Sequence, residues 1–182
     1  MNRTLVFHLR YYAGEYKHET SICQSGEWVC IGRQHIRAMR MEDFAANMKY
    51  FASSMNCSFI FPIVPNMFTS PKFRKSLARA FGLELSDLIS SRLRDNFMVL
   101  MVERTLAVQA RVLVDEVNST FSKSLGLFRR AAKLDDFTPL YDTFQKLPEG
   151  HARFRLLSEI KQSEDGQVPE RALQGGEKNM TT

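Results

Sequence analysis

The chain has 182 residues, of which 44% are hydrophobic, enough for one domain with a substantial core. Its formal net charge of +5 is a modest basic excess that favours an anionic partner such as double-stranded DNA. We expect no secretory signal, no membrane-spanning segment and no membrane partner, because the apolar runs are too short to cross a bilayer. The three cysteines are too few for a disulfide-rich secreted protein, so the sequence predicts residence in the cytoplasm.

Two segments near the N-terminus, residues 3–12 and 16–32, have the composition of β-strands, with turns at Gly14 and Gly26. We expect them to form N-terminal β-hairpin strands. Residues 42–55 follow with apolar side chains at helical spacing, Phe44, Met48 and Phe51, which predicts an amphipathic helix.

The cysteines of the expected hairpin are not directly opposite one another if the chain turns at residues 24–27. Cys23 and Cys30 are then predicted to be free thiols, as is the distant Cys57. None of the spacings matches the short Cys-x-x-Cys pairs of zinc sites, so we expect no metal and no cofactor. The alternative is a metal site completed by a histidine: His8, His18 or His35.

Residues 58–97 have the pattern of a short apolar strand followed by two short helices. Ser70 before Pro71 is a strong helix start, because the hydroxyl accepts an early amide and proline needs no donor there. Gly82 suits the left-handed C-cap that ends this helix, and Ser86 starts the second helix. Such small elements become stable when two copies pair.

This strand-helix-helix pattern resembles the ribbon-helix-helix family of DNA-binding dimers, through Pro65 after the strand and Gly-Leu-Glu-Leu-Ser-Asp-Leu-Ile at residues 82–89. The resemblance implies that two subunits pair their strands into an antiparallel ribbon in the major groove, and that the second helix start binds a phosphate. Both faces of the strand are apolar here, so base-reading side chains are expected elsewhere. The chain is also similar to AcaB-type activators of conjugative plasmids and integrative elements.

The predicted DNA contacts are basic side chains of the first helix, the start of the second helix, and a basic cluster before residue 42. These residues are Lys72, Arg74, Lys75, Arg79, Ser86, Asp87, Arg33, Arg37 and Arg40. Clustered basic residues bind phosphates in a salt-dependent manner. The alternative interpretation is a solvated basic surface without a partner.

The C-terminal half is expected to be largely helical. Residues 83–125 lack glycine and proline and carry an apolar stripe, which predicts a long helix from Ser86 to Ser124, bent near Asn96 and ended by Gly126. The stripe suits either an intramolecular core or a dimer seam. Shorter helices are expected at residues 127–134, before Leu147 and at 152–161.

The sequence contains no local catalytic motif, and we therefore expect the protein not to be an enzyme. His8 and His151 lack a partner at fixed spacing, and Asp115 and Glu116 are expected to be surface charges on the long helix.

The sequence thus predicts an α+β fold, with one DNA-binding domain over residues 1–161 and a disordered tail over 162–182. The functional hypothesis is a cytoplasmic, dimeric, sequence-specific transcriptional regulator of mobile-element or conjugation genes, which either recruits or blocks transcription. The resemblance to AcaB-type proteins implies an activator. Its expected partners are double-stranded DNA, a second copy of the chain and RNA polymerase. The alternatives are a relaxosome accessory protein, or an adaptor that pairs residues 58–64 with a partner protein.

Overall fold

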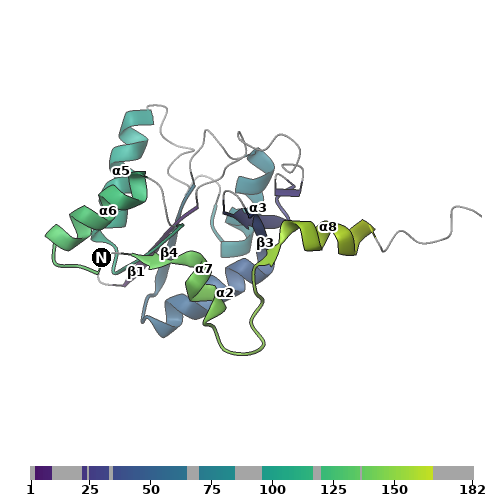
Figure 1. The fold of residues 1–182 in the computed structure, drawn as a ribbon. Coiled ribbons are helices and arrows are strands. Elements are labelled where there is room, and N and C mark those ends of the chain that lie inside the picture. The colour runs from purple at the N-terminus through teal and green to yellow at the C-terminus, as the bar shows by residue number, and fades with distance from the viewer. Residues whose placement is uncertain are drawn as a thin grey trace, which may run out of the picture.

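The computed structural model describes residues 3–9, 22–23, 25–32, 35–64, 70–84, 96–116, 120–135 and 137–165. At its centre lies a four-stranded sheet with the order β4-β1-β5-β6 (Figure 1). The strands are β1 (Thr4–His8), β4 (Phe59–Ile63), β5 (Val112–Asp115) and β6 (Thr138–Pro139).

The winding direction of this sheet reverses at β1. All pairings are parallel: β1 pairs with β4 on one side and with β5 on the other, and β5 pairs with β6. The chain therefore runs from β1 outward to β4, then crosses to the opposite side of β1 and continues through β5 to β6. A sheet wound in both directions receives helices on both faces, because crossovers between parallel strands are right-handed.

Helices cover both faces of the parallel sheet (Figure 1). Leu5 and Phe7 of β1 belong to a core shared with α2, α3 and α7, whereas Val6 belongs to a second core shared with α5 and α6. The helices are α2 (Met41–Ser54), α3 (Pro71–Phe81), α5 (Asn96–Gln109), α6 (Thr120–Ala131) and α7 (Leu140–Gln145). No helix in the described ranges is long and apolar enough to span a bilayer.

A small antiparallel sheet lies beside the main one, with the order β2-β3-β7. It packs against the C-terminal helix through Trp28, Ala38 and Leu157, which share one core cluster with Cys23. The elements are β2 (Trp28–Ile31), β3 (Arg37–Arg40), β7 (Arg155–Leu156) and α8 (Leu157–Asp165).

The expected α+β class is confirmed, and so are several elements. The strand expected within residues 58–64 is β4, and the helix expected at 42–55 is α2. The first helix of the strand-helix-helix pattern is α3, where the Ser70 hydroxyl accepts a hydrogen bond from the Phe73 amide at 3.1 Å. Gly82 ends α3 in the left-handed conformation, with φ +67°.

The N-terminal strands were predicted correctly in part. Strands are present within residues 3–12 and 16–32 as β1 and β2, but residues 22–23, expected in a strand, are helical, and β2 pairs with β3. The expected free thiols are wrong as well, because Cys23 and Cys30 form a disulfide with their Cα atoms 5.7 Å apart. The prediction assumed that Cys23 lies in a strand, where the register of a hairpin would keep its sulfur away from that of Cys30. Cys23 lies in a helical turn instead, so this restriction does not apply. Cys57 is a free, buried thiol, and the turn expected at Gly14 lies outside the described residues.

The single long helix expected over residues 86–124 is also wrong. The α5 helix ends at Gln109, β5 follows, and α6 begins at Thr120 and contains Gly126 instead of ending there. Residues 112–115 form a strand buried on both faces, and such a strand is continuously apolar. The sequence pattern of these residues therefore fits the apolar stripe of a helix as well as it fits a central strand.

The ribbon-helix-helix arrangement is not confirmed. One edge of β4 pairs in parallel with β1 of the same chain, whereas the family resemblance implies an antiparallel ribbon between subunits. Pro65 and the second helix start, with Ser86 and Asp87, lie outside the described residues.

The C-terminal elements agree in part with expectation. The short helix expected before Leu147 is α7, and the helix expected at 127–134 is the second half of α6. The last helix begins at Leu157 and runs to Asp165, past the expected domain end at residue 161. Most of the tail expected to be disordered, residues 166–182, lies outside the described part of the chain.

Candidate functional site

The carboxyl ends of β1 and β5 form the point at which the sheet changes its winding direction. In doubly wound sheets, the chain segments that follow the two strands at such a point run to opposite faces of the sheet. They leave a crevice between them, in which ligands bind. His8 is the last residue of β1 and Asp115 the last residue of β5, and the two are direct partners in the strand register. Two ionisable side chains therefore end the two strands that flank this point.

His8 and Asp115 form a buried polar pair. The His8 Nδ1–H donates a hydrogen bond of 3.0 Å to Asp115 Oδ1, and the residues are 4% and 0% exposed. Their side chains point toward the α5–α6 side, because each is two residues from a side chain of that core, Val6 or Leu113. The carboxylate fixes the imidazole tautomer and leaves the lone pair of the neutral ring on Nε2.

The second oxygen of Asp115 is unusual in this interior. Asp115 Oδ2 is buried and has no hydrogen-bond partner in the described part of the structure. Buried carboxylate oxygens are almost always satisfied, and an exception calls for a specific cause such as a bound ligand or a catalytic proton. This oxygen therefore marks the pair as more than a structural contact.

Glu103 of α5 adds a third ionisable group. Its side chain is 6% exposed, and burial raises its pKa to about 7, with the charge of His8 acting in the opposite direction. A carboxyl group with a pKa near neutrality accepts and releases protons with equal ease at physiological pH. The site thus combines an oriented imidazole with a carboxyl group tuned for proton transfer.

The small antiparallel sheet is hydrogen-bonded to the carboxyl edge of the parallel sheet. The Gly32 amide, directly after β2, donates a hydrogen bond to the carboxylate of Glu116, directly after β5. Gly32 has φ +90°, and an added Cβ would meet the main-chain oxygen of His35 at 2.7 Å, so only glycine fits this turn. The Ser122 hydroxyl donates to the main-chain oxygen of Glu116 at 3.4 Å.

Metal binding has no support in the described residues. Across those ranges, no three or more His, Cys, Asp or Glu side chains are grouped so that they could hold a metal ion.

The predicted DNA contacts on α3 are brought together on one surface. Lys72, Lys75 and Arg79 are exposed and follow one another at spacings of three and four residues, whereas Arg74 is half-buried. The opposite face of α3 packs into the core through Phe73. The helix is therefore anchored by one face and presents three cations on another.

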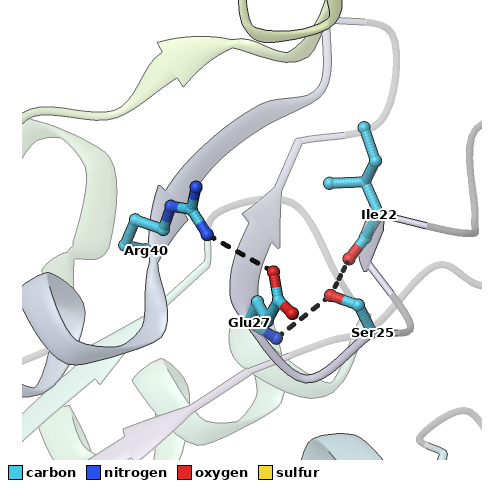
Figure 2. Close-up of polar contacts among 4 residues, drawn as sticks. All are labelled: Ile22, Ser25, Glu27 and Arg40. Carbon is cyan, nitrogen blue, oxygen red and sulfur yellow. Dashed lines mark hydrogen bonds and ion pairs between the residues drawn. The ribbon is translucent and has the colours of Figure 1, made fainter. Parts of the chain in front are cut away.

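Arg40 and Arg79 come together in a groove of about 620 Å³ between α3 and the start of α2. Three carboxylates line the same groove, from Glu27, Glu42 and Asp43. Arg40 pairs with Glu27 at 3.3 Å (Figure 2) and lies 4.2 Å from the centre of the Trp28 ring. The groove is of mixed charge, which makes it a poor site for a phosphate backbone.

A tight turn positions Glu27 against α3. The Ser25 hydroxyl donates to the Ile22 main-chain oxygen at 2.7 Å and accepts from the Glu27 amide at 3.1 Å (Figure 2). A Cβ on Gly26 would lie 2.9 Å from the main-chain oxygen of Lys72, so the turn rests directly on the helix. The Cys23–Cys30 disulfide closes the loop that contains this turn.

Of the remaining predicted contacts, Arg37 lies among the described residues and stacks on α7. The guanidinium of Arg37 lies 4.5 Å from the centre of the Tyr141 ring. Arg33, Ser86 and Asp87 lie outside the described residues.

Sequence reasoning missed the site at the sheet edge. His8 and Asp115 are 107 residues apart, and Asp115 was expected on the surface of a helix, an expectation that its complete burial contradicts. A signal was present: two short apolar runs, Thr-Leu-Val-Phe-His and Val-Leu-Val-Asp, each end in an ionisable residue. Apolar strands ending in such residues are typical of parallel sheets with a site at their carboxyl edge. Comparisons with models of protein families, with curated proteins and with solved structures found no match.

Proposed function

We propose that the protein binds a small polar ligand at the carboxyl edge of the parallel sheet, between β1 and β5, and transfers protons to and from it. The observation that carries this proposal is the buried His8–Asp115 pair at the winding reversal, with Asp115 Oδ2 unpartnered. The nearby Glu103, whose pKa is raised to about 7, supports it. Three buried ionisable groups are costly in a structural core, and functional sites are where such groups concentrate.

The roles follow from the geometry. His8 is the proton acceptor, because its hydrogen bond to Asp115 leaves the lone pair on Nε2. Asp115 is a positioning residue that orients the imidazole and stabilises its protonated form. Glu103 is the proton donor, since burial keeps a large fraction of it protonated near neutral pH.

This proposal competes with the sequence-based expectation that the protein is not an enzyme. The first test is a thermal-shift screen of the purified chain against nucleotides, sugar phosphates, amino acids and small carboxylic acids. We expect at least one compound to raise the melting temperature of the wild type and not that of Asp115→Asn. Asp115→Asn must itself remain folded, which circular dichroism checks; if it does not, His8→Gln, at the partner of Asp115, replaces it.

A screening hit is then tested for turnover across pH. Proton transfer predicts that Glu103→Gln lowers turnover and removes one limb of the pH profile while ligand binding persists. A screen without hits, or a hit that stabilises Asp115→Asn as much as the wild type, would refute the sheet-edge site.

We propose DNA binding as a second candidate function, carried by the exposed cationic stripe of Lys72, Lys75 and Arg79 on α3. In this candidate the protein is a cytoplasmic, dimeric regulator of conjugation or other mobile-element genes, and the stripe contacts the phosphate backbone. The ribbon-helix-helix resemblance and the partnership with RNA polymerase belong to this candidate.

Fluorescence anisotropy tests it, with the upstream region of the gene and a scrambled duplex at two salt concentrations. We expect Lys72→Ala/Lys75→Ala to weaken binding about tenfold and to flatten its salt dependence. The matched control is Lys123→Ala/Lys133→Ala, which removes the same charge from α6 and the turn after it. Equal, weak binding to both duplexes, or equal losses in the two variants, would rule DNA binding out.

The redox state of the disulfide in cells also distinguishes between the two candidate functions. Disulfides are rare in the cytoplasm, where the regulator would act. A Cys23–Cys30 bond that persists in cells, detected by alkylation of free thiols before lysis, would argue against cytoplasmic DNA binding and leave the sheet-edge site untouched.

A further inference from the structure

The α5 helix carries few charges and exposes apolar side chains on the side away from the sheet. Glu103 and Arg104 are its only charged residues over Asn96–Gln109. One side faces the sheet through Glu103 and Ala107, both buried, while Met98 and Met101 on the other side are exposed.

The α6 helix continues this exposed apolar surface. Leu127, 62% exposed, and Phe128 lie on its outer side. The guanidinium of Arg104 stacks 3.8 Å from the centre of the Phe128 ring and so joins the outer sides of the two helices. We define the α5–α6 face as the exposed apolar residues of this region: Met98, Met101, Leu127, Phe128 and Leu134.

Most of the exposed large hydrophobic side chains of the described residues lie in the α5–α6 face. Among the described residues, eight large hydrophobic side chains are exposed, and five of them belong to the α5–α6 face. Single exposed hydrophobic residues are normal on a protein surface, whereas a group of them in one region marks an interaction site. Figure 1 shows α5 and α6 together at one side of the molecule, away from α2 and α3.

The charges beside this face are mainly positive. Lys123 on α6 and Lys133 directly after it are exposed, and Arg104 lies between the two helices. A second copy of the chain would bring the same cations together, so self-association through this face is unfavourable. A lipid surface would bury the central Arg104 in hydrocarbon at high cost.

We propose that the α5–α6 face docks an acidic amphipathic helix of a partner protein. The partner's apolar side would cover the methionines, Leu127 and Phe128, and its carboxylates would pair with Arg104, Lys123 and Lys133. Methionine side chains adapt their shape to a partner, and two helices side by side present a groove for a third. This inference is independent of the sheet-edge site.

The test is a titration of the full chain with a fluorescent synthetic helix that carries leucines on one side and glutamates on the other. A second peptide has every glutamate replaced by lysine. We expect the acidic peptide to bind with Kd on the order of 10–100 μM and the basic peptide about tenfold more weakly or not at all.

Two variants locate the binding surface. Leu127→Ser/Phe128→Ser changes only exposed side chains and is expected to weaken the acidic peptide about tenfold. Phe59→Ser, at an exposed residue of β4, is the control and is expected to bind like the wild type. Three results would each overturn the proposal: no binding of the acidic peptide, equal losses in both variants, or concentration-dependent dimers that the α6 variant abolishes.

Discussion

The guanidinium of Arg129 on α6 donates a hydrogen bond of 2.7 Å to the main-chain oxygen of Ala110, just beyond the end of α5. It also donates to the main-chain oxygens of Ala107 at 2.9 Å and Asp135 at 2.6 Å, and the residue is 1% exposed. A buried cation thus satisfies carbonyl groups at the negative end of the α5 dipole. Because α5 carries Glu103, this contact also holds the third group of the sheet-edge site in place.

Replacement of Arg129 should therefore be costly. We expect Arg129→Lys to lower the free energy of unfolding by about 3 kcal/mol, because one ammonium group cannot reach all of these carbonyls and leaves some of them buried without donors. Urea denaturation measures the loss. The exposed neighbour Arg130→Lys is the control and should change stability by less than about 0.5 kcal/mol. Equal effects of the two substitutions would show that the hydrogen bonds of Arg129 are not important for stability.

Glu103 should make stability depend on pH. Burial raises its pKa to about 7 from the ordinary glutamate value of 4.5, so the folded state holds a proton that the unfolded state releases. Its contribution is fully present below the unfolded pKa and is lost as pH rises through about 7. We expect Glu103→Gln to stabilise the protein by up to about 3 kcal/mol near pH 8 and to flatten the pH dependence between about pH 5 and pH 8.

Thermal melts across this range measure the Glu103 effect. The control is the exposed Glu149→Gln, which should leave the pH dependence unchanged. If Glu103→Gln followed the wild-type pH curve, Glu103 would be an ordinary solvated carboxylate and a poor proton donor.

The Cys23–Cys30 disulfide should stabilise the loop that rests on α3. A sequence separation of seven residues predicts a loss of about 2.5 kcal/mol on reduction, from the loop-closure entropy of the unfolded chain. Denaturation with and without reductant measures it, with Cys23→Ser/Cys30→Ser as the genetic equivalent. Thiol titration of the denatured protein should give one thiol when oxidised and three when reduced. Three thiols in the untreated protein would show that the bond does not form.

A comparison of two glycines with similar φ angles measures how much the contact between the 25–27 turn and α3 contributes to stability. Gly26 has φ +82° and an added Cβ would approach the Lys72 main-chain oxygen to 2.9 Å, whereas Gly150 has φ +90° with nothing within 4 Å. We expect Gly150→Ala to cost about 1 kcal/mol, from backbone strain alone, and Gly26→Ala about 2–3 kcal/mol. Equal losses in urea denaturation would mean that the turn does not rest on α3.

The elements that sequence analysis predicted correctly are those whose causes are local. The start of α3 depends on Ser70 and Phe73, three residues apart, and its end depends on the left-handed conformation of Gly82. The periodicity that predicts α2 likewise involves residues three and four apart, such as Phe44 and Met48. Neighbours in the sequence interact in the same way whatever the rest of the chain does, so these features need no tertiary information.

The remaining features depend on contacts between distant residues. Residues 112–115 have a pattern that suits a helix or a buried strand, and only pairing with β1 decides between the two. The same pairing creates the contact between His8 and Asp115, which no local spacing encodes. The disulfide depends on Cys23 lying in a helical turn beside β2. The sequence by itself therefore determined composition, the caps of α3 and the amphipathic α2, whereas tertiary structure decided the parallel sheet and the site at its edge. Strand pairing joins residues that are remote in the chain, and its energy arises only when the chain has folded.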